Sequence, residues 1–272
     1  MSPPAMSPFS VMGVVNVTPD SFSDGGLYLD VDAAVDHAIE LRAQGADIVD
    51  FGAESTRPGS QPITPEQEMA RVIPVIERVA EALTGAQLSI DTSKFEVAQA
   101  ALLAGATYVN DVTALRGSPD LAGLVASTGA DCCLMHMLGE PGTMQDSPHY
   151  EDVVDDVRAF LEQRLAYAVG EGIAESKISL DPGIGFGKSV EHNLELLRRL
   201  PEIVAIGRPV VIGTSRKAFI GQLMGGAAPG LRLPGTIATN VLALERGARV
   251  FRVHDVGLVR SALTVAAATF GG

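Results

Sequence analysis

The chain has few cysteines and no long apolar run, and both absences exclude whole classes of protein. Its only cysteines, Cys132 and Cys133, are adjacent within one apolar run. Neighbours on a strand point to opposite faces, so we expect neither a disulfide nor a metal site there and interpret both as core residues. No stretch reaches the ~20 apolar residues of a membrane span, and residues 1–6 lack the basic start and apolar centre of a secretory signal. We therefore expect a soluble, cytoplasmic protein with no membrane partner.

Positive charge is also scarce. The 272 residues include 20 Lys and Arg against 33 Asp and Glu, so the formal net charge is -13. An acidic protein repels nucleic acids and anionic membranes, which argues against either as a partner. Any anionic substrate must therefore be held by a few local groups rather than by general electrostatic attraction.

What the chain does have is a recurrence of eight short apolar runs, each followed by polar residues that a packed core does not need. The runs span residues 11–15, 48–49, 88–90, 108–109, 132–135, 178–180, 210–212 and 250–251. Short apolar runs with polar carboxyl ends, separated by helical patterns, predict a barrel of parallel strands with its active site at one rim. We expect an α/β fold, a (β/α)8 TIM barrel, as a single domain over 1–272 in which residues 1–10 form a loose N-terminal extension.

Between the runs, apolar residues recur at helical spacing. Thr64, Pro65 and Gln67 supply an N-cap, a proline for the first turn and a capping-box partner, which predicts that a helix begins there. Gly45 suits the left-handed end of the preceding helix. The other predicted helices span residues 31–41, 94–103, 120–127, 152–169, 190–200 and 256–268.

A doubly wound open sheet is the main structural alternative, because it also alternates strands with helices. No G-x-G-x-x-G motif follows the first run, which argues against a dinucleotide-binding sheet. The glycine-rich segment 183–187 follows the sixth run, but its spacing does not fit that motif. It indicates only a sharp turn of the backbone.

Three polar side chains, Asp91, Asn110 and Asp181, end different runs. On a closed barrel they can converge on a flat heterocycle with several N–H donors, because carboxylates and a carboxamide accept hydrogen bonds. Alternatives stay open: Asp91 and Asp181 can act as general acid and base, or can hold a divalent cation together with Asp50 and Asp111. Asp91 can equally be the N-cap of the helix that follows it.

A second polar group lies where the first and eighth runs end. Arg252 and His254 are two residues apart, so both point to the same face and can share one anion. Asn16 ends the first run, which neighbours the eighth in a closed barrel. Two donors and a neutral oxygen ligand suit a diphosphate accompanied by Mg²⁺, so we predict Mg²⁺ as the cofactor and Asn16 as its protein ligand.

The seventh run passes into a helix through residues 214–219. Such a junction offers free backbone N–H groups to an anion, while Lys217 can reach into the site. The alternative is an ordinary helix start with solvated basic residues. His136 ends the fifth run and His149 lies in a predicted loop, and the sequence indicates a partner for neither.

Taken in order, these motifs strongly resemble those of the dihydropteroate synthases, the folate-pathway enzymes targeted by sulfonamides. The matching segments are MGVVNVTPDSFSDGG at 12–26, ESTRPG at 54–59, SIDT at 89–92, VND at 109–111, DPGIGF at 181–186, SRK at 215–217 and RVHD at 252–255. The resemblance implies a TIM-barrel transferase. Its implied reaction condenses 6-hydroxymethyl-7,8-dihydropterin diphosphate with p-aminobenzoate and releases diphosphate.

The resemblance also divides the site residues among the ligands. The pterin is implied to contact Asp91, Asn110, Met135, Asp181, Gly185, Phe186, Gly213 and Lys217. The diphosphate and Mg²⁺ are implied to contact Asn16, Arg252 and His254. The p-aminobenzoate pocket is implied to contain Phe22, Thr56, Arg57, Pro58, Phe186, Lys217 and Ala218. The residues that carry the chemistry are then Asp91, Lys217, Arg252 and His254.

This division predicts a dissociative substitution in which the C–O bond breaks before the arylamine is fully engaged. Asp91 stabilises the cationic pterin methylene, and closure of the loop at 19–26, with Phe22, excludes water. Ala218 stands where many members have serine, so we expect binding of p-aminobenzoate, and of sulfonamides as competitive inhibitors, to depend on it. A homodimer is also implied, through late helices such as 256–268 with apolar Leu258, Val259, Leu263 and Val265.

Two rival functions remain. A pterin-dependent methyltransferase shares the barrel and the pterin-binding acceptors, but it needs neither the motifs at 215–217 and 252–254 nor the Phe22 loop, and all three are present. A non-catalytic paralogue that binds pterin would have lost some of the polar residues assigned to catalysis. The chain retains Asn16, Asp91, Lys217, Arg252 and His254.

Overall fold

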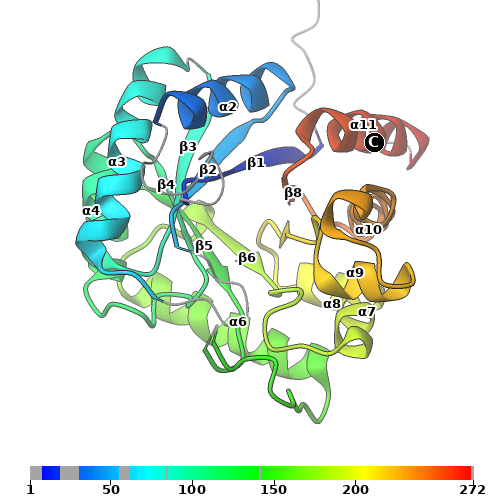
Figure 1. Cartoon of the computed structure of the whole chain (residues 1–272). Coiled ribbons are helices and arrows are strands. Elements are labelled where there is room, and N and C mark those ends of the chain that lie inside the picture. The colour runs from blue at the N-terminus through cyan, green and yellow to red at the C-terminus, as the bar shows by residue number, and fades with distance from the viewer. Residues whose placement is uncertain (1–7, 19–30, 55–61, 84, 141, 271–272) are drawn as a thin grey trace, which may run out of the picture.

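The structure is a computed structural model that describes residues 8–18, 31–54, 62–83, 85–140 and 142–270. Its centre is one parallel sheet of eight strands in the order β6-β5-β4-β3-β2-β1-β8-β7 (Figure 1). The strands are β1 Ser10–Asn16, β2 Ile48–Gly52, β3 Gln87–Asp91, β4 Tyr108–Asp111, β5 Asp131–Met135, β6 Ile178–Asp181, β7 Val211–Ile212 and β8 Val250–Val253. A bridge between Leu180 and Val210 joins the two outermost strands, so the sheet closes into the predicted barrel. An open doubly wound sheet is excluded.

Helices follow the strands and form the outer layer of the barrel (Figure 1). In the first half of the chain these are α2 Val31–Ala43, α3 Pro65–Ala82, α4 Phe95–Leu103 and α5 Leu121–Thr128. The second half adds α6 Val153–Gly170, η1 Glu175–Lys177, α7 Val190–Arg198, α8 Leu200–Val204, α9 Ala218–Leu223, η2 Pro229–Leu231, α10 Leu233–Glu245 and α11 Val256–Phe270. Each connection runs from the end of one strand over the outside to the start of the next, which brings all the strand ends to one rim.

Local chemistry explains the ends of these helices. Thr64 caps α3 as predicted: its hydroxyl accepts from the Gln67 backbone N–H and the Gln67 side chain accepts from the Thr64 N–H. The helix predicted over 190–200 is wrong as one element, because α7 ends at Arg198 and α8 starts at Leu200. Pro201 has no N–H to donate to the carbonyl four residues before it, so the bonding of α7 stops, and the proline lies in the first turn of α8 instead.

The two faces of the strands bury different sets of side chains. Outward-facing residues, among them Cys132, pack against the helices in the main apolar core, whereas a smaller cluster fills the inside of the barrel floor. That inner cluster contains Met12, Ile48, Tyr108, Cys133 and Val211. The adjacent cysteines are thus free thiols on opposite faces, as predicted. Burial of each large apolar side chain stabilises the folded chain by about 1.5–3 kcal/mol. The core therefore offsets the cost of burying polar groups at the carboxyl ends of the strands.

The N-terminal stretch enters the barrel earlier than expected. Residues 1–7 lie outside the described part, but Phe9 is buried and packs edge-on against Phe251, with ring centroids 6.2 Å apart. Ser10 already begins β1. Within the expected loose extension over 1–10, these two residues therefore belong to the packed fold. In the described part of the chain, no helix has the length and apolar character to cross a membrane.

Candidate active site at the carboxyl ends of the strands

The polar residues predicted at the run ends lie at the mouth of the barrel. Successive side chains of a strand point to opposite faces. A residue two or four positions after a member of the inner cluster therefore also points into the barrel interior. The register confirms the neighbours: Asp91 pairs with Asn110 across β3 and β4, and Met135 pairs with Asp181 across β5 and β6. Asn110 and Asp181 are buried, while Asn16 at the end of β1 is partly exposed. The structure thus brings the predicted acceptors together.

Arg252 joins three strands through its guanidinium. Its Nε donates to Asp50 Oδ2 at 2.7 Å, and its Nη2 donates to Asp91 Oδ2 at 2.7 Å. Asp50 also accepts from Ser89 Oγ at 2.5 Å and from Asn110 Nδ2 at 3.2 Å. A buried carboxylate is costly unless such partners surround it, and Asp50 is fully buried. Asp50 therefore holds both Arg252 and Asn110 in place.

Asp91 joins this network through Arg252. Burial raises its pKa to about 7, although the Arg252 guanidinium acts in the opposite direction. The interpretation of Asp91 as a helix N-cap is wrong: Asp91 belongs to β3, and α4 has Lys94 at its N-cap position, with no side-chain cap. A carboxylate that faces the mouth instead of a helix end is available to a ligand.

The alternative of a divalent-cation site built from Asp50, Asp91, Asp111 and Asp181 is not supported. Asp111 accepts from the backbone N–H groups of Thr113 (2.7 Å) and Leu115 (2.6 Å), so it shapes the loop after β4. Asp50 is engaged by Arg252. Among the residues that the structure describes, no group of three or more His, Cys, Asp or Glu side chains has metal-binding geometry. A cation in this site would need oxygens from a ligand.

The turn after β6 supplies a second side of the mouth. Asp181 Oδ1 accepts from the Gly183 N–H at 2.6 Å, and the Gly185 N–H donates to Asn193 Oδ1 at 2.7 Å. Gly183 has a φ of +67°, and a Cβ there would collide with the His136 carbonyl oxygen. Only glycine fits so close an approach. The turn that carries Phe186 is thus fixed by its backbone.

Lys217 reaches this turn from the loop after the neighbouring strand β7. Its Nζ donates to the Ile184 carbonyl and lies 4.5 Å from the centre of the Phe186 ring. Burial lowers the pKa of Lys217 to about 8, against the effect of Asp181. A Cβ on Gly213 would lie 3.9 Å from Lys217 Nζ and 4.0 Å from Arg252 Cβ. The glycine therefore leaves open space between the two cations.

The junction between β7 and α9 differs in part from the prediction. Its backbone N–H groups are not all free: that of Arg216 donates to Thr236 Oγ1 at 3.1 Å and that of Lys217 to the Thr214 carbonyl at 3.1 Å. Both of these N–H groups are used within the fold, and α9 begins beyond them at the exposed Ala218. An anion at this junction stays a prediction, and it would have to use other N–H groups than these two.

Arg216 and Ser215 are also not solvated basic and polar groups. Arg216 forms a two-pronged ion pair with Asp255, through Nη2 at 2.6 Å and Nε at 3.0 Å. Its φ of +59° is strained for a residue with a side chain. Ser215 Oγ lies 2.9 Å from His254 Nδ1 and accepts from the His254 N–H at 3.2 Å. These contacts lock the loop after β7 to the end of β8, and they orient His254.

An apolar wall completes the mouth. Met135 packs with Val112, Met137 and Met144 in a separate buried cluster, against which Phe186 lies. Sulfur and aromatic side chains suit the face of a flat ring. Acceptors, two cations and an apolar wall therefore surround one space.

Four predicted site residues, Phe22, Thr56, Arg57 and Pro58, lie outside the described residues. The base of the second loop is described. There Glu54 accepts from Lys94 Nζ at 2.5 Å and from the Ile63 N–H at 3.1 Å, and Lys94 also donates to the buried Glu68 at 2.5 Å. One lysine thus ties the end of β2 to helix α3.

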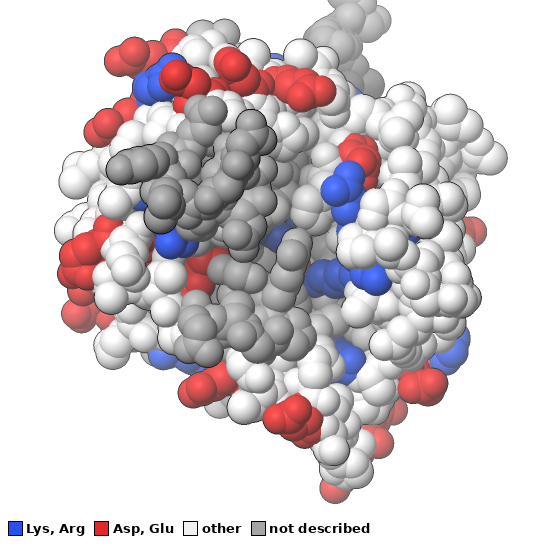
Figure 2. Space-filling model, in the orientation of Figure 1, with Lys and Arg blue, Asp and Glu red and all other residues white. Residues whose placement is uncertain are grey.

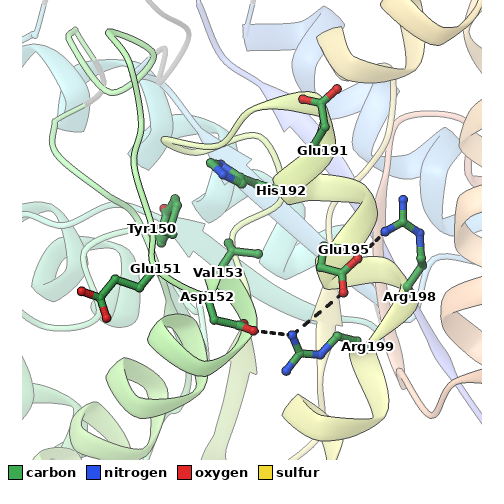
Figure 3. A pocket seen from close by; sticks show the side chains of 9 residues that line it. All are labelled: Tyr150, Glu151, Asp152, Val153, Glu191, His192, Glu195, Arg198 and Arg199. Atoms are coloured by element: carbon green, nitrogen blue, oxygen red, sulfur yellow. Dashed lines mark hydrogen bonds and ion pairs between the residues drawn. The ribbon is translucent and has the colours of Figure 1, made fainter.

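Charge is distributed unevenly over the face in view in Figure 2: Lys and Arg side chains gather near its centre, while most of the Asp and Glu side chains lie toward its edge. A separate hollow of about 370 Å³ lies between the start of α6 and helix α7 (Figure 3). Its lining residues include Asp152 and Arg199, paired at 2.7 Å, and His192, which also belongs to the cap of α7. These side chains hold helices together on the outside of the barrel, so the hollow is not the strand-end site.

Comparison with known proteins agrees with this geometry. Residues 12–254 match the family described as pterin binding enzyme. The dihydropteroate synthase of Escherichia coli K12 is 45% identical over 259 residues, which cover 95% of this chain and 91% of that protein. The chain belongs to the dihydropteroate synthase family.

Solved structures of the family share the fold. The Xanthomonas albilineans dihydropteroate synthase with 4-aminobenzoic acid superposes with a TM-score of 0.90 at 48% identity, over 97% of this chain and 93% of that one. The Yersinia pestis enzyme in a sulfonamide drug complex gives a TM-score of 0.92 at 42% identity, over 98% and 96% of the two chains. Relatives this similar make the chain an enzyme, a transferase with the TIM-barrel fold.

Within this dihydropteroate synthase fold, some supporting residues escaped prediction. Asp50 could be recognised only as a run-end carboxylate, and nothing in the sequence pairs Ser215 with His254 or Arg216 with Asp255. His136 also has a partner, Lys188, whose Nζ lies 2.9 Å from His136 Nδ1. These partners are 39 to 202 residues apart along the chain, so no local pattern predicts them.

Proposed function

We infer that this protein is a dihydropteroate synthase, which joins 6-hydroxymethyl-7,8-dihydropterin diphosphate to p-aminobenzoate and releases diphosphate in folate biosynthesis. One observation carries the proposal: Asp91, Asn110 and Asp181 converge with Lys217 at one barrel mouth, in a chain of this family. Three acceptors and one cation match a ring that has several N–H donors and one carbonyl oxygen.

The pterin would lie between the charged network and the apolar wall. Asp181 and Asn110 offer acceptors to the donor edge of the ring, and Lys217 offers an N–H to its oxygen. Asn110 already donates to Asp50, a carboxylate that can only accept, so its amide nitrogen is fixed on that side. Its oxygen is then turned toward the ligand. Met135 and Phe186 would cover the face of the ring.

The diphosphate would be held beside it by Asn16, Arg252 and His254. Bound Mg²⁺ would neutralise charge on the leaving diphosphate. The donor set fits that role: Asn16 offers a neutral oxygen at the open end of β1. Among the described residues no group of acidic, His or Cys side chains forms a closed cage, so diphosphate oxygens and water would supply the other ligands. Arg252 must then share its donors among Asp50, Asp91 and the anion.

We propose a dissociative order of steps. Arg252 and His254 stabilise the negative charge that develops on diphosphate, so that the methylene C–O bond breaks first. Asp91, once ionised, faces the resulting cation and stabilises it until the arylamine nitrogen attacks the same carbon. The amine then loses a proton. As the family resemblance implies, closure of the loop at 19–26 would limit the competing attack by water.

The arylamine would enter on the side of α9. Phe186, Lys217 and Ala218 line this side among the described residues, and the family implies Phe22, Thr56, Arg57 and Pro58 from the first two loops. The carboxylate of p-aminobenzoate would meet the first N–H groups of α9. Competitive inhibition by sulfonamides follows from the same pocket, since they replace the arylamine.

The test is diphosphate release from the purified protein. We expect release that requires both p-aminobenzoate and Mg²⁺ and that yields 7,8-dihydropteroate in equal amount. Release that continues without p-aminobenzoate contradicts synthase activity. A methyl transfer from a methylated pterin would support the methyltransferase alternative, whereas pterin binding without either reaction would support the non-catalytic paralogue.

We also propose that two copies of the chain associate through the late helices. Leu258 and Val265 on α11 and Leu242 on α10 are exposed apolar side chains, and these two helices pack side by side. Figure 2 shows little charge on the right-hand side of the molecule, where these helices lie in Figure 1. Val259 and Leu263, which we expected on that surface, are fully buried in the monomer core instead. Sedimentation of Leu258→Glu tests the proposal: we expect a monomer where the wild type is a dimer.

A further inference from the structure

A lysine and a histidine are buried together behind the pterin side of the mouth. His136 follows β5 directly, and Lys188 ends the turn between β6 and α7. Lys188 is only 3% exposed, its Nζ lies 2.9 Å from His136 Nδ1, and it donates to the Phe186 carbonyl at 3.0 Å. Burial of an amino group is costly. Neither residue has a place in the reaction described above.

His136 is suited to be the partner of a lysine. Burial, with help from Lys188 and Arg116, lowers the pKa of His136 to about 2, so the ring is neutral. In the tautomer that carries its proton on Nε2, Nδ1 accepts a hydrogen bond. The ring is held edge-on by Phe160, with centroids 4.9 Å apart, and the His136 backbone N–H donates to the Asp181 carbonyl at 3.0 Å. The histidine is thus a fixed acceptor at the foot of the turn.

The turn itself depends on polar attachments. Gly185 is bonded through its N–H to Asn193, and its carbonyl accepts from Gln145 Nε2 at 2.7 Å. The backbone of Phe186 is held by two hydrogen bonds: its N–H donates to the Gly183 carbonyl at 3.0 Å and its carbonyl accepts from Lys188. Its ring lies against the apolar cluster and near Lys217, and Tyr150 donates to the next carbonyl, that of Gly187, at 2.8 Å. Loss of the lysine would therefore free the Phe186 carbonyl, which is one of the contacts that direct this ring.

We propose that Lys188 and His136 are a positioning pair, which holds the 183–187 turn so that Phe186 and Asp181 keep the geometry that receives the pterin ring. The inference rests on the proposed function, because it assigns the turn to the pterin. Neither residue touches substrate. The pair acts through the Phe186 carbonyl and through the contact between β5 and β6.

The pair also has an electrostatic consequence. The charged and titratable groups around Asp181 are Lys217, Lys188, Arg252 and the Cys133 thiol. Burial raises the pKa of Asp181, and Lys217, Lys188 and Arg252 act in the opposite direction. Burial lowers the pKa of Lys188 itself, and Asp181 acts in the opposite direction. Where the lysine carries its proton, its removal leaves the rise in the Asp181 pKa less opposed. Protonation of Asp181 would then begin at a higher pH.

The experiment measures equilibrium binding of 6-hydroxymethylpterin, together with thermal unfolding, for four variants. Lys188→Met and His136→Leu remove one partner each, His136→Asn keeps an acceptor near the Nδ1 position, and Leu161→Ala lowers stability from the core of α6, away from the turn. We expect about tenfold weaker binding for the first two variants, from the loss of one buried hydrogen bond. His136→Asn should bind within about threefold of the wild type. Leu161→Ala should bind like the wild type at temperatures where it is folded.

A pH series adds a readout that mere destabilisation does not change. In Lys188→Met, the pH below which pterin binding is lost should move upward, whereas Leu161→Ala should leave it unchanged. Wild-type affinity in both Lys188→Met and His136→Leu overturns the proposal, as does an equal loss in Leu161→Ala. Failure of the proposed function is distinguishable, because it appears in the wild type as missing p-aminobenzoate-dependent diphosphate release.

Discussion

The two sides of the barrel mouth hold buried charge in different ways. On the side of β2, β3 and β8, Arg252 lies between two carboxylates, Asp50 and Asp91, at 2.7 Å from each. On the side of β6 and β7, Lys217 has a backbone carbonyl and an aromatic ring as its neighbours. The first arrangement is a network in which each member depends on the others. The second is a set of separate groups that the backbone holds in place. We therefore expect a smaller loss of folding free energy when one of them is removed.

Arg252→Met should have the largest effect. It leaves Asp50 and Asp91 buried without their cation, which costs about 3–5 kcal/mol of folding free energy. It also removes a donor to the leaving diphosphate, so kcat should fall by about a hundredfold to a thousandfold. Urea unfolding and diphosphate release measure the two effects.

The matched control is Arg252→Lys, which keeps the charge but not the fork that reaches two carboxylates. It should recover part of the stability and little of the activity. In the double variant Arg252→Met with Asp50→Asn, stability should improve over Arg252→Met alone, because one unpaired carboxylate is gone. Equal stability of Arg252→Met and wild type would refute the network.

Asp91→Asn should rank second. Burial raises the pKa of Asp91 to about 7, and the ionised form is the one that stabilises a cation. In the wild type, kcat/KM for the pterin diphosphate should therefore rise as the pH increases through about 7. Asp91→Asn should lower kcat by about a hundredfold and abolish this acid limb.

Asp111→Asn serves as control for Asp91→Asn, because Asp111 is a buried carboxylate at the next strand end that holds a loop instead of facing the mouth. The Asp111→Asn variant should be less stable than the wild type, and its kcat/KM should still rise as the pH increases through about 7. If Asp91→Asn turns over normally with bound substrate, Asp91 has no electrostatic role in the reaction.

Lys217→Met tests the other side of the mouth. Burial lowers the pKa of Lys217 to about 8, so kcat/KM in the wild type should fall as the pH rises above about 8 and the lysine loses its proton. The variant should lack this alkaline limb and raise the KM for the pterin substrate by about tenfold. Its stability should change less than that of Arg252→Met, because no carboxylate loses its bonded partner.

Lys217→Arg keeps the positive charge at all accessible pH values and checks the assignment. Its alkaline limb should also vanish, but with a smaller rise in KM than for Lys217→Met. An alkaline limb that persists in either variant would assign the titration to another group. A stability loss as large as that of Arg252→Met would erase the contrast between the two sides.

Ala218→Ser should have the smallest effect. Ala218 is exposed at the start of α9. A hydroxyl there can donate to the carboxylate of p-aminobenzoate, worth about 1 kcal/mol. The KM for p-aminobenzoate should fall by about fivefold, while that for the pterin substrate stays unchanged. A change in the pterin KM instead would place the arylamine elsewhere.

Much of the fold followed from local patterns. The eight apolar runs became the eight strands, and the capping box at Thr64 starts α3 as predicted, because hydrophobic periodicity and cap chemistry act within a few residues. Pro201 broke the helix predicted over 190–200, although its effect was also readable locally. Phe9 was placed in a loose segment because its burial depends on Phe251, more than 200 residues away.

The candidate site divides in the same way. The sequence by itself determined which residues end strands, because a parallel barrel brings all carboxyl ends to one rim, and Asp91, Asn110 and Asp181 did arrive there together. Only the tertiary structure decided that Arg252 pairs with Asp50 and Asp91, that Ser215 orients His254, and that Lys188 meets His136. These contacts depend on barrel closure and side-chain packing between distant segments. Strand order places the groups at the rim, but three-dimensional distance sets their partners and their charges.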